Sequence, residues 1–196
     1  MMTMRWYKLM VIVLLIGAVF LLAGCATTDP AFYRAAEFKP EFIDQITLLP
    51  AVDARTDKAA AVNLEDWLRV EAATNLRKKG YAVLLSAMAR GTPELTYDTL
   101  RAADLALIKR LGPPGERWIM ILALVDLNVA GSRGKVEAAG FLYDKEKGTL
   151  LWRDTSICLV GQGDWIFGTL TSEVRGKRVI SEAAHCLLAS IPTRGP

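Results

Sequence analysis

The chain has 196 residues, and its 24 basic and 21 acidic residues give a formal net charge of +3. This small charge, with no basic run longer than Arg77-Lys78-Lys79, excludes nucleic acid from the expected partners. His185 is the only histidine and the cysteines lack metal-site spacing, so we expect neither a metal nor a cofactor.

The first 25 residues have the order of a lipoprotein signal peptide. Arg5 and Lys8 precede an apolar run over residues 11–22. That run has about 12 residues, fewer than the ~20 that a membrane-spanning helix needs. It ends in Leu22-Ala23-Gly24-Cys25, which resembles a lipobox, where signal peptidase II cuts and the cysteine thiol receives a diacylglyceryl group. We therefore expect Leu22, Ala23 and Gly24 to direct cleavage and Cys25 to carry the lipid; the alternative is an uncleaved anchor with an incidental cysteine.

The predicted division is a signal peptide over residues 1–24, a lipidated tether over residues 25–43 and one domain over residues 44–196. The acyl chains on Cys25, palmitate among them, would bind the chain to a lipid bilayer. Ala26 follows the cysteine, where an Asp retains lipoproteins in the inner membrane in enterobacterial-type sorting. We thus expect the outer membrane, with the domain facing the periplasm; the inner membrane stays open as an alternative.

The first half of the domain predicts a strand, a helix and a second strand. Residues 45–52 have a continuous apolar core, typical of a strand buried on both faces. Asn63 is the expected N-cap of a helix with one apolar stripe, and Gly80 ends that helix. Residues 81–85 form the next strand, so we expect a parallel pair joined by a crossover helix.

The second half predicts a helix over residues 96–111 and a terminal helix over residues 170–191. Between them, three strands over residues 118–129, 135–144 and 149–161 are joined by glycine-containing turns. The predicted fold is α/β: a single domain with a mixed sheet of about five strands flanked by three helices, in the order β-α-β-α-β-β-β-α.

Two acidic residues and one arginine follow the first predicted strand. Ligands of α/β sheets bind at the carboxyl ends of parallel strands, so Asp53 and Arg55 mark where a small-ligand site would lie. The alternative is a solvated loop with a local ion pair between these two residues.

An apolar tripeptide, Trp165-Ile166-Phe167, lies between Gly163 and Gly168. Large apolar side chains on a loop either fill the core or form a partner surface, so Trp165, Ile166 and Phe167 are candidates for a protein interface. The glycine-rich segment lacks the Lys-Ser/Thr ending of a phosphate loop, so we reject that interpretation.

Two cysteines remain in the domain. The periplasm permits a disulfide between Cys158 and Cys186. Because a domain of this size needs no covalent staple, the sequence favours two separate buried cysteines, with the disulfide left open.

Three short patterns, over residues 46–50 (ITLLP), 76–81 (LRKKGY) and 141–152 (FLYDKEKGTLLW), resemble small bacterial envelope lipoproteins. Their α/β domain is similar to the amino-terminal domain of the Tol-system propeller protein. Relatives include a neisserial-type lipoprotein, the activator lipoproteins of penicillin-binding proteins and the curli secretion lipoprotein. The resemblance spans roughly residues 44–188. It implies binding or assembly rather than catalysis, and no catalytic residue can be transferred from the family.

The expected function is therefore that of a membrane-anchored periplasmic lipoprotein, a non-enzymatic protein-interaction or assembly module in envelope biogenesis or maintenance. Its expected partners are the lipid bilayer and another envelope protein. The alternative is a small-ligand-binding periplasmic domain that uses the loop at Asp53 and Arg55.

Overall fold

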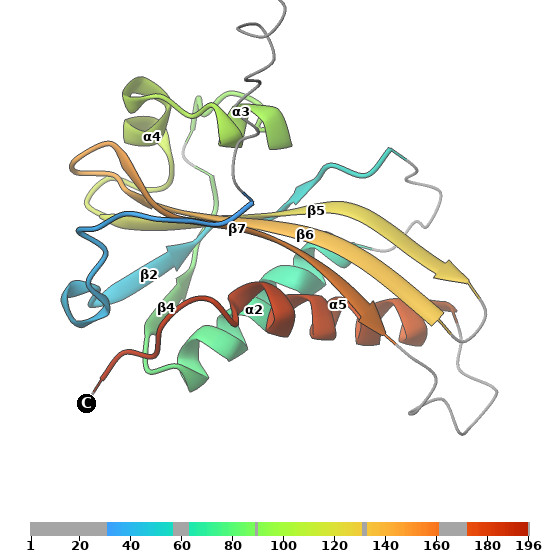
Figure 1. Cartoon of the computed structure of the whole chain (residues 1–196). Coiled ribbons are helices and arrows are strands. Elements are labelled where there is room, and N and C mark those ends of the chain that lie inside the picture. Colours follow the sequence, from blue (N-terminus) through green and yellow to red (C-terminus); the bar gives the residue numbers. More distant parts are fainter. Residues whose placement is uncertain (1–30, 57–62, 89, 131–132, 161–171, 196) are drawn as a thin grey trace, which may run out of the picture. The chain divides into compact units, whose positions relative to one another are not determined.

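A mixed sheet of seven strands forms the centre of the fold (Figure 1). The structure is a computed structural model that describes residues 31–56, 63–88, 90–130, 133–160 and 172–195. The strand order is β1-β7-β6-β5-β2-β4, and β3 pairs separately with β5. The strands are β1 (Tyr33–Arg34), β2 (Gln45–Leu48), β3 (Val52–Asp53), β4 (Ala82–Leu85), β5 (Trp118–Ala130), β6 (Arg133–Asp144) and β7 (Thr149–Val160).

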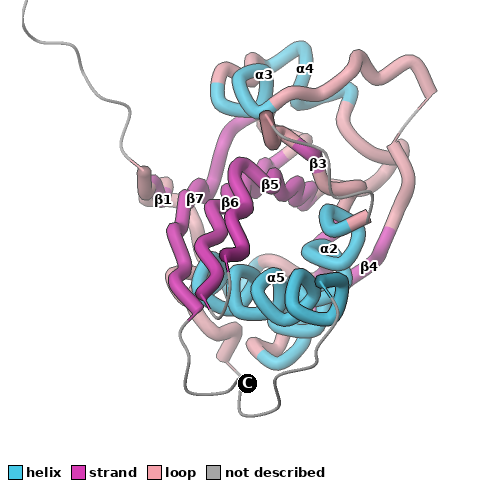
Figure 2. Tube along the Cα trace, turned by 90° about the vertical axis from the view of Figure 1, so that its right-hand side faces the viewer, coloured by secondary structure: helices cyan, strands magenta, loops and turns pink. Residues whose placement is uncertain are grey.

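Helices lie on both faces of this sheet (Figures 1 and 2). Two long helices, α2 (Leu64–Lys78) and α5 (Ser172–Leu188), pack against each other and cover one face. Two short helices, α3 (Tyr97–Arg101) and α4 (Leu105–Arg110), lie on the other face. A 3-10 turn over Pro40–Phe42 precedes β2. Among the described residues, no helix is both long and apolar enough to cross a bilayer.

The core has two layers because β5 is apolar on both faces. Successive side chains of a strand point to opposite faces, so Leu122 packs beneath α2 and α5 while Ile121 packs beneath α3 and α4. The core positions that the sequence predicted are confirmed: Leu48, Leu76, Leu122 and Leu187 are all fully buried.

The predicted strand–helix–strand unit is also confirmed. Strands β2 and β4 are parallel neighbours, and α2 connects them. Gly80 ends α2 with a φ of +90°, a left-handed conformation that glycine adopts without strain. Asn63 occupies the N-cap position, but its side chain makes no capping hydrogen bond.

The predicted counts of five strands and three helices are wrong. Two strands of two residues each, β1 and β3, were missed. The strand predicted over residues 45–52 ends at Leu48, before Pro50, and resumes beside β5 as β3. The helix predicted over residues 96–111 is two helices, because the Asp104 carboxylate accepts a hydrogen bond from the Leu107 amide at 2.8 Å and so begins a new helix.

Residues 31–43, expected to belong to the tether, lie in the same compact unit as the rest of the domain. Strand β1 pairs antiparallel with β7, and Tyr33 lies opposite Arg153. Phe38 and Ile43 are buried in the core. The folded domain therefore begins before residue 44. The signal peptide, Cys25 and residues 26–30 lie outside the described residues.

Candidate functional site

Asp53 and Arg55, the predicted ligand end of the sheet, bind each other. Asp53 lies on β3, and its two carboxylate oxygens accept hydrogen bonds from Arg55 Nε at 2.8 Å and from Arg55 Nη2 at 2.9 Å. The Arg55 side chain is buried rather than solvated. The predicted local ion pair is therefore present, and the bidentate geometry engages the groups that would have contacted a ligand.

A second arginine, Arg69, binds the backbone at the carboxyl ends of β2 and β4, and no local sequence pattern indicates this contact. Arg69 of α2 donates to the Leu48 carbonyl oxygen at 2.9 and 3.2 Å and also to the Ser86 carbonyl oxygen. Burial lowers the pKa of Arg69, and the nearby Asp66 carboxylate opposes that shift. These carbonyl groups, where a ligand of an α/β sheet would bind, are thus satisfied by the protein's own side chain.

The other candidate surface, Trp165-Ile166-Phe167, lies outside the described residues, between β7 and α5. Whether this loop fills the core or forms a partner surface stays a prediction. The strand that leads into it is described and has an open edge.

Strand β7 has two different halves. In the inner half, residues 149–153, Trp152 and Arg153 are buried, and β1 pairs with the edge of the strand that faces away from β6. In the outer half, residues 154–160, no described strand pairs with that edge. Ile157 and Leu159, both on this outer half, have exposed fractions of 57% and 76%. Large apolar side chains on an unpaired edge strand are typical of a strand-pairing interface.

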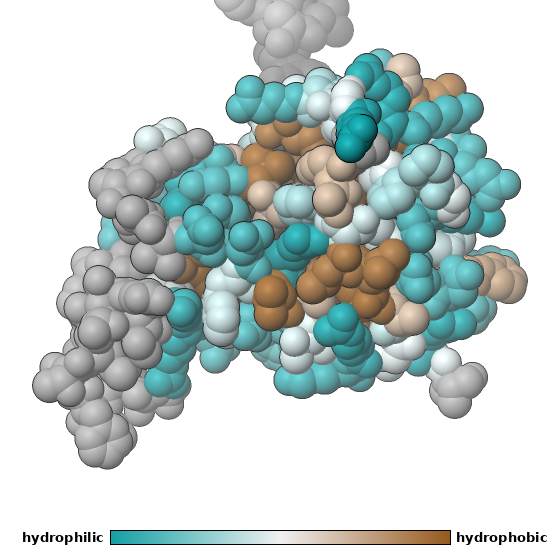
Figure 3. Space-filling view, turned by 180° about the vertical axis from the view of Figure 1, so that it is seen from behind, coloured by the Kyte–Doolittle hydropathy of each residue, from teal (hydrophilic) through white to brown (hydrophobic). Residues whose placement is uncertain are grey.

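The opposite edge of the sheet, β4, also exposes apolar side chains. Leu84 and Leu85 have exposed fractions of 39% and 41%. Seen from behind, the surface carries a brown, apolar patch among hydrophilic side chains (Figure 3). At the β4 edge, however, Arg77 of α2 donates to the Val83 carbonyl oxygen at 3.2 Å. A charged side chain thus lies against the backbone of β4 and disfavours the addition of another strand.

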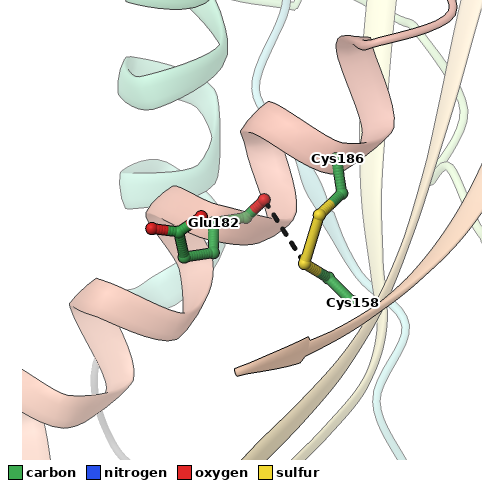
Figure 4. Close-up of a disulfide and its surroundings, with 3 residues drawn as sticks. All are labelled: Cys158, Glu182 and Cys186. Atoms are coloured by element: carbon green, nitrogen blue, oxygen red, sulfur yellow. Dashed lines mark hydrogen bonds between the residues drawn. A yellow bond between two sulfur atoms is a disulfide. The ribbon is translucent and has the colours of Figure 1, made fainter. Parts of the chain in front are cut away.

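A disulfide joins Cys158 of β7 to Cys186 of α5, with 6.3 Å between their Cα atoms (Figure 4). The Cys158 Sγ lies 3.6 Å from the Glu182 carbonyl oxygen, on the preceding turn of α5. The preference for two separate cysteines is therefore wrong. The physical reason is tertiary: α5 packs on the face of β7 that carries Cys158, which brings two distant cysteines together.

A depression of about 400 Å³ lies beside the amino end of β5 and is lined by charged side chains. Three of those side chains make contacts within the fold. Arg117 forms an ion pair with the buried Asp144 at 2.9 Å, and this contact raises the pKa of Arg117. Lys145 donates to the Pro113 carbonyl oxygen at 2.8 Å, and burial lowers the pKa of Lys145. Glu116 accepts a hydrogen bond from the buried Thr47 hydroxyl at 2.6 Å.

Within the described part of the chain, no three His, Cys, Asp or Glu residues lie close enough to hold a metal ion. His185 is exposed on α5. Among the large apolar side chains of the described residues, Leu159 has the largest exposed fraction, and no described strand pairs with the half of β7 that carries it.

No protein-family model and no curated protein sequence matches the chain. Solved structures do match. The PelC dodecamer from Paraburkholderia phytofirmans has 12% sequence identity and a TM-score of 0.50, over 81% of this chain and 94% of that chain. The hypothetical protein CT253 from Chlamydia trachomatis has 9% identity and a TM-score of 0.50, over 76% and 95%.

A third structure is the lipoprotein GNA1162 from Neisseria meningitidis, with 16% identity and a TM-score of 0.44 over 69% of this chain and 92% of that chain. A neisserial lipoprotein is thus among the structural neighbours. The resemblance to the Tol-system propeller domain stays a prediction. At these identities the likeness concerns the fold alone: the chain has the mixed α/β fold found in PelC and CT253.

Proposed function

We propose that this protein is a lipid-anchored, non-enzymatic assembly module of the bacterial envelope, and that it binds its partner protein by adding a strand to the outer half of β7. One observation carries the proposal: Ile157 and Leu159 are exposed on an edge that no described strand covers. Strand addition uses backbone hydrogen bonds for affinity and alternate side chains for specificity.

The direction in which the backbone groups of β7 point supports this mode of binding. Strand β1 pairs Tyr33 with Arg153, and the Ala35 amide donates to the Leu151 carbonyl oxygen at 2.8 Å, so the backbone groups of Arg153 point outward, toward β1. The pairing of β7 with β6 is regular from Arg153 to Val160, so the backbone groups of Thr155, Ile157 and Leu159 point outward as well. The same three residues would therefore supply both the hydrogen bonds and the apolar contacts.

The charges nearby favour an edge contact over a contact on the face of the sheet. On the adjacent strands, Lys135 and Asp126 form a half-exposed ion pair, with 3.7 Å between Nζ and Oδ2. Lys135 lies directly opposite Leu159 in the sheet. A partner laid over this face would have to cover those charges, whereas a strand added to the edge leaves them in water.

An assembly role also agrees with one of the structural neighbours, since the PelC structure is described as a dodecamer. The small-ligand alternative has no comparable support. A ligand at the predicted end of the sheet would have to displace the ion pair between Asp53 and Arg55.

The anchor rests on the lipobox and has its own test. In cells that express the full chain, Cys25→Ala should abolish incorporation of labelled palmitate and leave the signal peptide uncleaved. Normal palmitate labelling of this variant would refute the proposed anchor.

The binding surface is tested by replacing Leu159 with a photoreactive amino acid in the full, lipidated chain. Irradiation of intact cells should give a higher-mass protein adduct, which mass spectrometry identifies. The matched control places the same amino acid at Leu84, an exposed leucine on the opposite edge strand. No adduct at residue 159, or an equal adduct at residue 84, would contradict the proposal.

A further inference from the structure

We infer that the strand added to β7 comes from a second copy of this chain, paired antiparallel about a two-fold axis at Ile157. This inference rests on the proposed function, because it assigns the partner of the same edge. Tyr33, the first residue of β1, lies opposite Arg153, and β7 ends at Val160. The window that no described strand covers is therefore residues 154–160, and Ile157 is its centre.

A second copy of this window fits the first over its whole length in one register only. In that register Ile157 faces Ile157 of the partner subunit, and Thr155 faces Leu159 of the partner subunit. Any shift shortens the pairing at one end. Pairing cannot extend inward beyond residue 154, because β1 already occupies the edge at Arg153. The fold thus bounds the interface and fixes its register.

The backbone of the window suits this pairing. The backbone groups of Thr155, Ile157 and Leu159 point outward, because those of Arg153 point toward β1 and the pairing of β7 with β6 is regular from Arg153 to Val160. In an antiparallel pair, residues of this kind exchange both of their hydrogen bonds. The three facing pairs would form about six backbone hydrogen bonds across the axis.

The side chains are also self-complementary. Residues 155–160 carry no charge, so a second copy brings no like charges opposite one another. The one charged residue of the window, Asp154, accepts a hydrogen bond from Ser190 of its own chain. Several charges or a proline would have disfavoured self-pairing, and residues 155–160 contain neither.

Each end of the window offers a contact for the incoming leucine. The Thr155 hydroxyl lies 3.4 Å from the Tyr97 hydroxyl of α3, and the Tyr97 ring packs on Phe141 with 6.2 Å between ring centroids. Leu159 of the partner subunit, facing Thr155, would therefore lie beside the half-buried Tyr97. The two-fold axis repeats this contact at the other end.

The test uses two differently tagged copies of the full, lipidated chain, expressed together and extracted in mild detergent. Capture of one tag should recover the other. Leu159→Lys should reduce the recovery about tenfold, because it places a lysine against Thr155 and Tyr97 of the partner subunit. Leu84→Lys, a charge at an exposed leucine on the opposite edge, should leave recovery unchanged.

The register is tested by charge complementation. Thr155→Glu alone should also reduce recovery, whereas the double variant Leu159→Lys/Thr155→Glu should restore it to within about threefold of the unaltered chain, because each lysine then faces a glutamate. No recovery with the unaltered tags, no effect of Leu159→Lys, or an equal loss with Leu84→Lys would overturn the inference. An adduct at residue 159 that contains a different protein would contradict self-pairing but would agree with the proposed function. The absence of any adduct at residue 159 would contradict both proposals.

Discussion

The two edges of the sheet expose similar apolar side chains but differ in what protects their backbones. On β4, Leu84 is exposed and Arg77 binds the Val83 carbonyl oxygen. On the outer half of β7, Ile157 and Leu159 are more exposed than Leu84, and residues 155–160 carry no charge. Unprotected edge strands are rare in proteins that stay monomeric, so the comparison favours β7 over β4 as the edge of the proposed partner contact.

The edges also differ in how they are fixed to the helices. The β4 edge is held to α2 by arginine side chains, through the contacts of Arg69 and Arg77. The β7 edge is held to α5 by the disulfide between Cys158 and Cys186. The disulfide fixes the helix-covered face of β7 and leaves the backbone of the strand open. Each of these attachments, the disulfide and the two arginine contacts, can be removed separately by mutation.

The largest expected effect comes from breaking the disulfide. Its cysteines are 28 residues apart in sequence, a loop for which chain entropy gives a stabilisation of about 3–4 kcal/mol. Cys158→Ala/Cys186→Ala should lower the free energy of unfolding by that amount in a denaturant titration. Thiol labelling of the denatured, unreduced domain should find neither cysteine free; two labelled thiols would show that this attachment does not form.

The next effect concerns the β4 edge. Arg69→Met keeps the length of the side chain but leaves the Leu48 and Ser86 carbonyl groups without their guanidinium partner, and should cost about 2–3 kcal/mol of unfolding free energy. Arg77→Met, at a single exposed contact, should cost less than about 1 kcal/mol. Equal losses of unfolding free energy in the two variants would contradict the conclusion that Arg69 stabilises the fold more than Arg77 does.

A smaller, pH-dependent effect is expected where the chain enters β4. The buried Tyr81 donates to the Pro192 carbonyl oxygen at 2.9 Å, and burial raises the pKa of Tyr81 from 10.0 to about 12. Since the folded pKa is raised, this stabilisation is complete below pH 10 and is lost as the pH rises from 10 to 12.

In Tyr81→Phe, the loss of unfolding free energy between pH 9 and pH 12 should be about 2 kcal/mol smaller than in the unaltered protein, as denaturant titrations would show. Tyr143, whose pKa burial also raises, remains in both proteins and serves as the common background. An identical pH dependence in the two proteins would mean that Tyr81 ionises freely in the folded state.

The long elements could be predicted from the sequence because their signals are local. The apolar run of β5 and the helical stripe of α2 each repeat within one segment, so their positions do not depend on distant residues. Strands β1 and β3 were missed because two residues carry no periodicity. Asp104 was read as part of a continuous helix, although its carboxylate begins a new one.

The candidate sites depend on distant contacts and were harder to predict. The ion pair between Asp53 and Arg55 was foreseen as a local alternative, but the cap formed by Arg69 requires two strand ends and a helix to meet. Ile157 is exposed because it lies on the face of β7 opposite Cys158, outside the cores beneath α5 and beneath α3 and α4, which no local pattern reveals. The pairing of the two domain cysteines likewise depends on where α5 packs.

The most direct test of the edge comparison uses the double variant Ile157→Lys/Leu159→Lys in the full, lipidated chain. Both side chains are largely exposed, and the new lysines lie opposite Glu137 and Lys135, one favourable and one unfavourable pair, so the free energy of unfolding should change by less than about 1 kcal/mol. Cross-linking through the photoreactive amino acid, placed in this variant at Thr155 on the same edge, should nevertheless fall about tenfold. Unchanged stability with lost cross-linking is the predicted result. Cross-linking at the unaltered level, or a large loss of stability, would contradict the assignment of this edge as the partner surface.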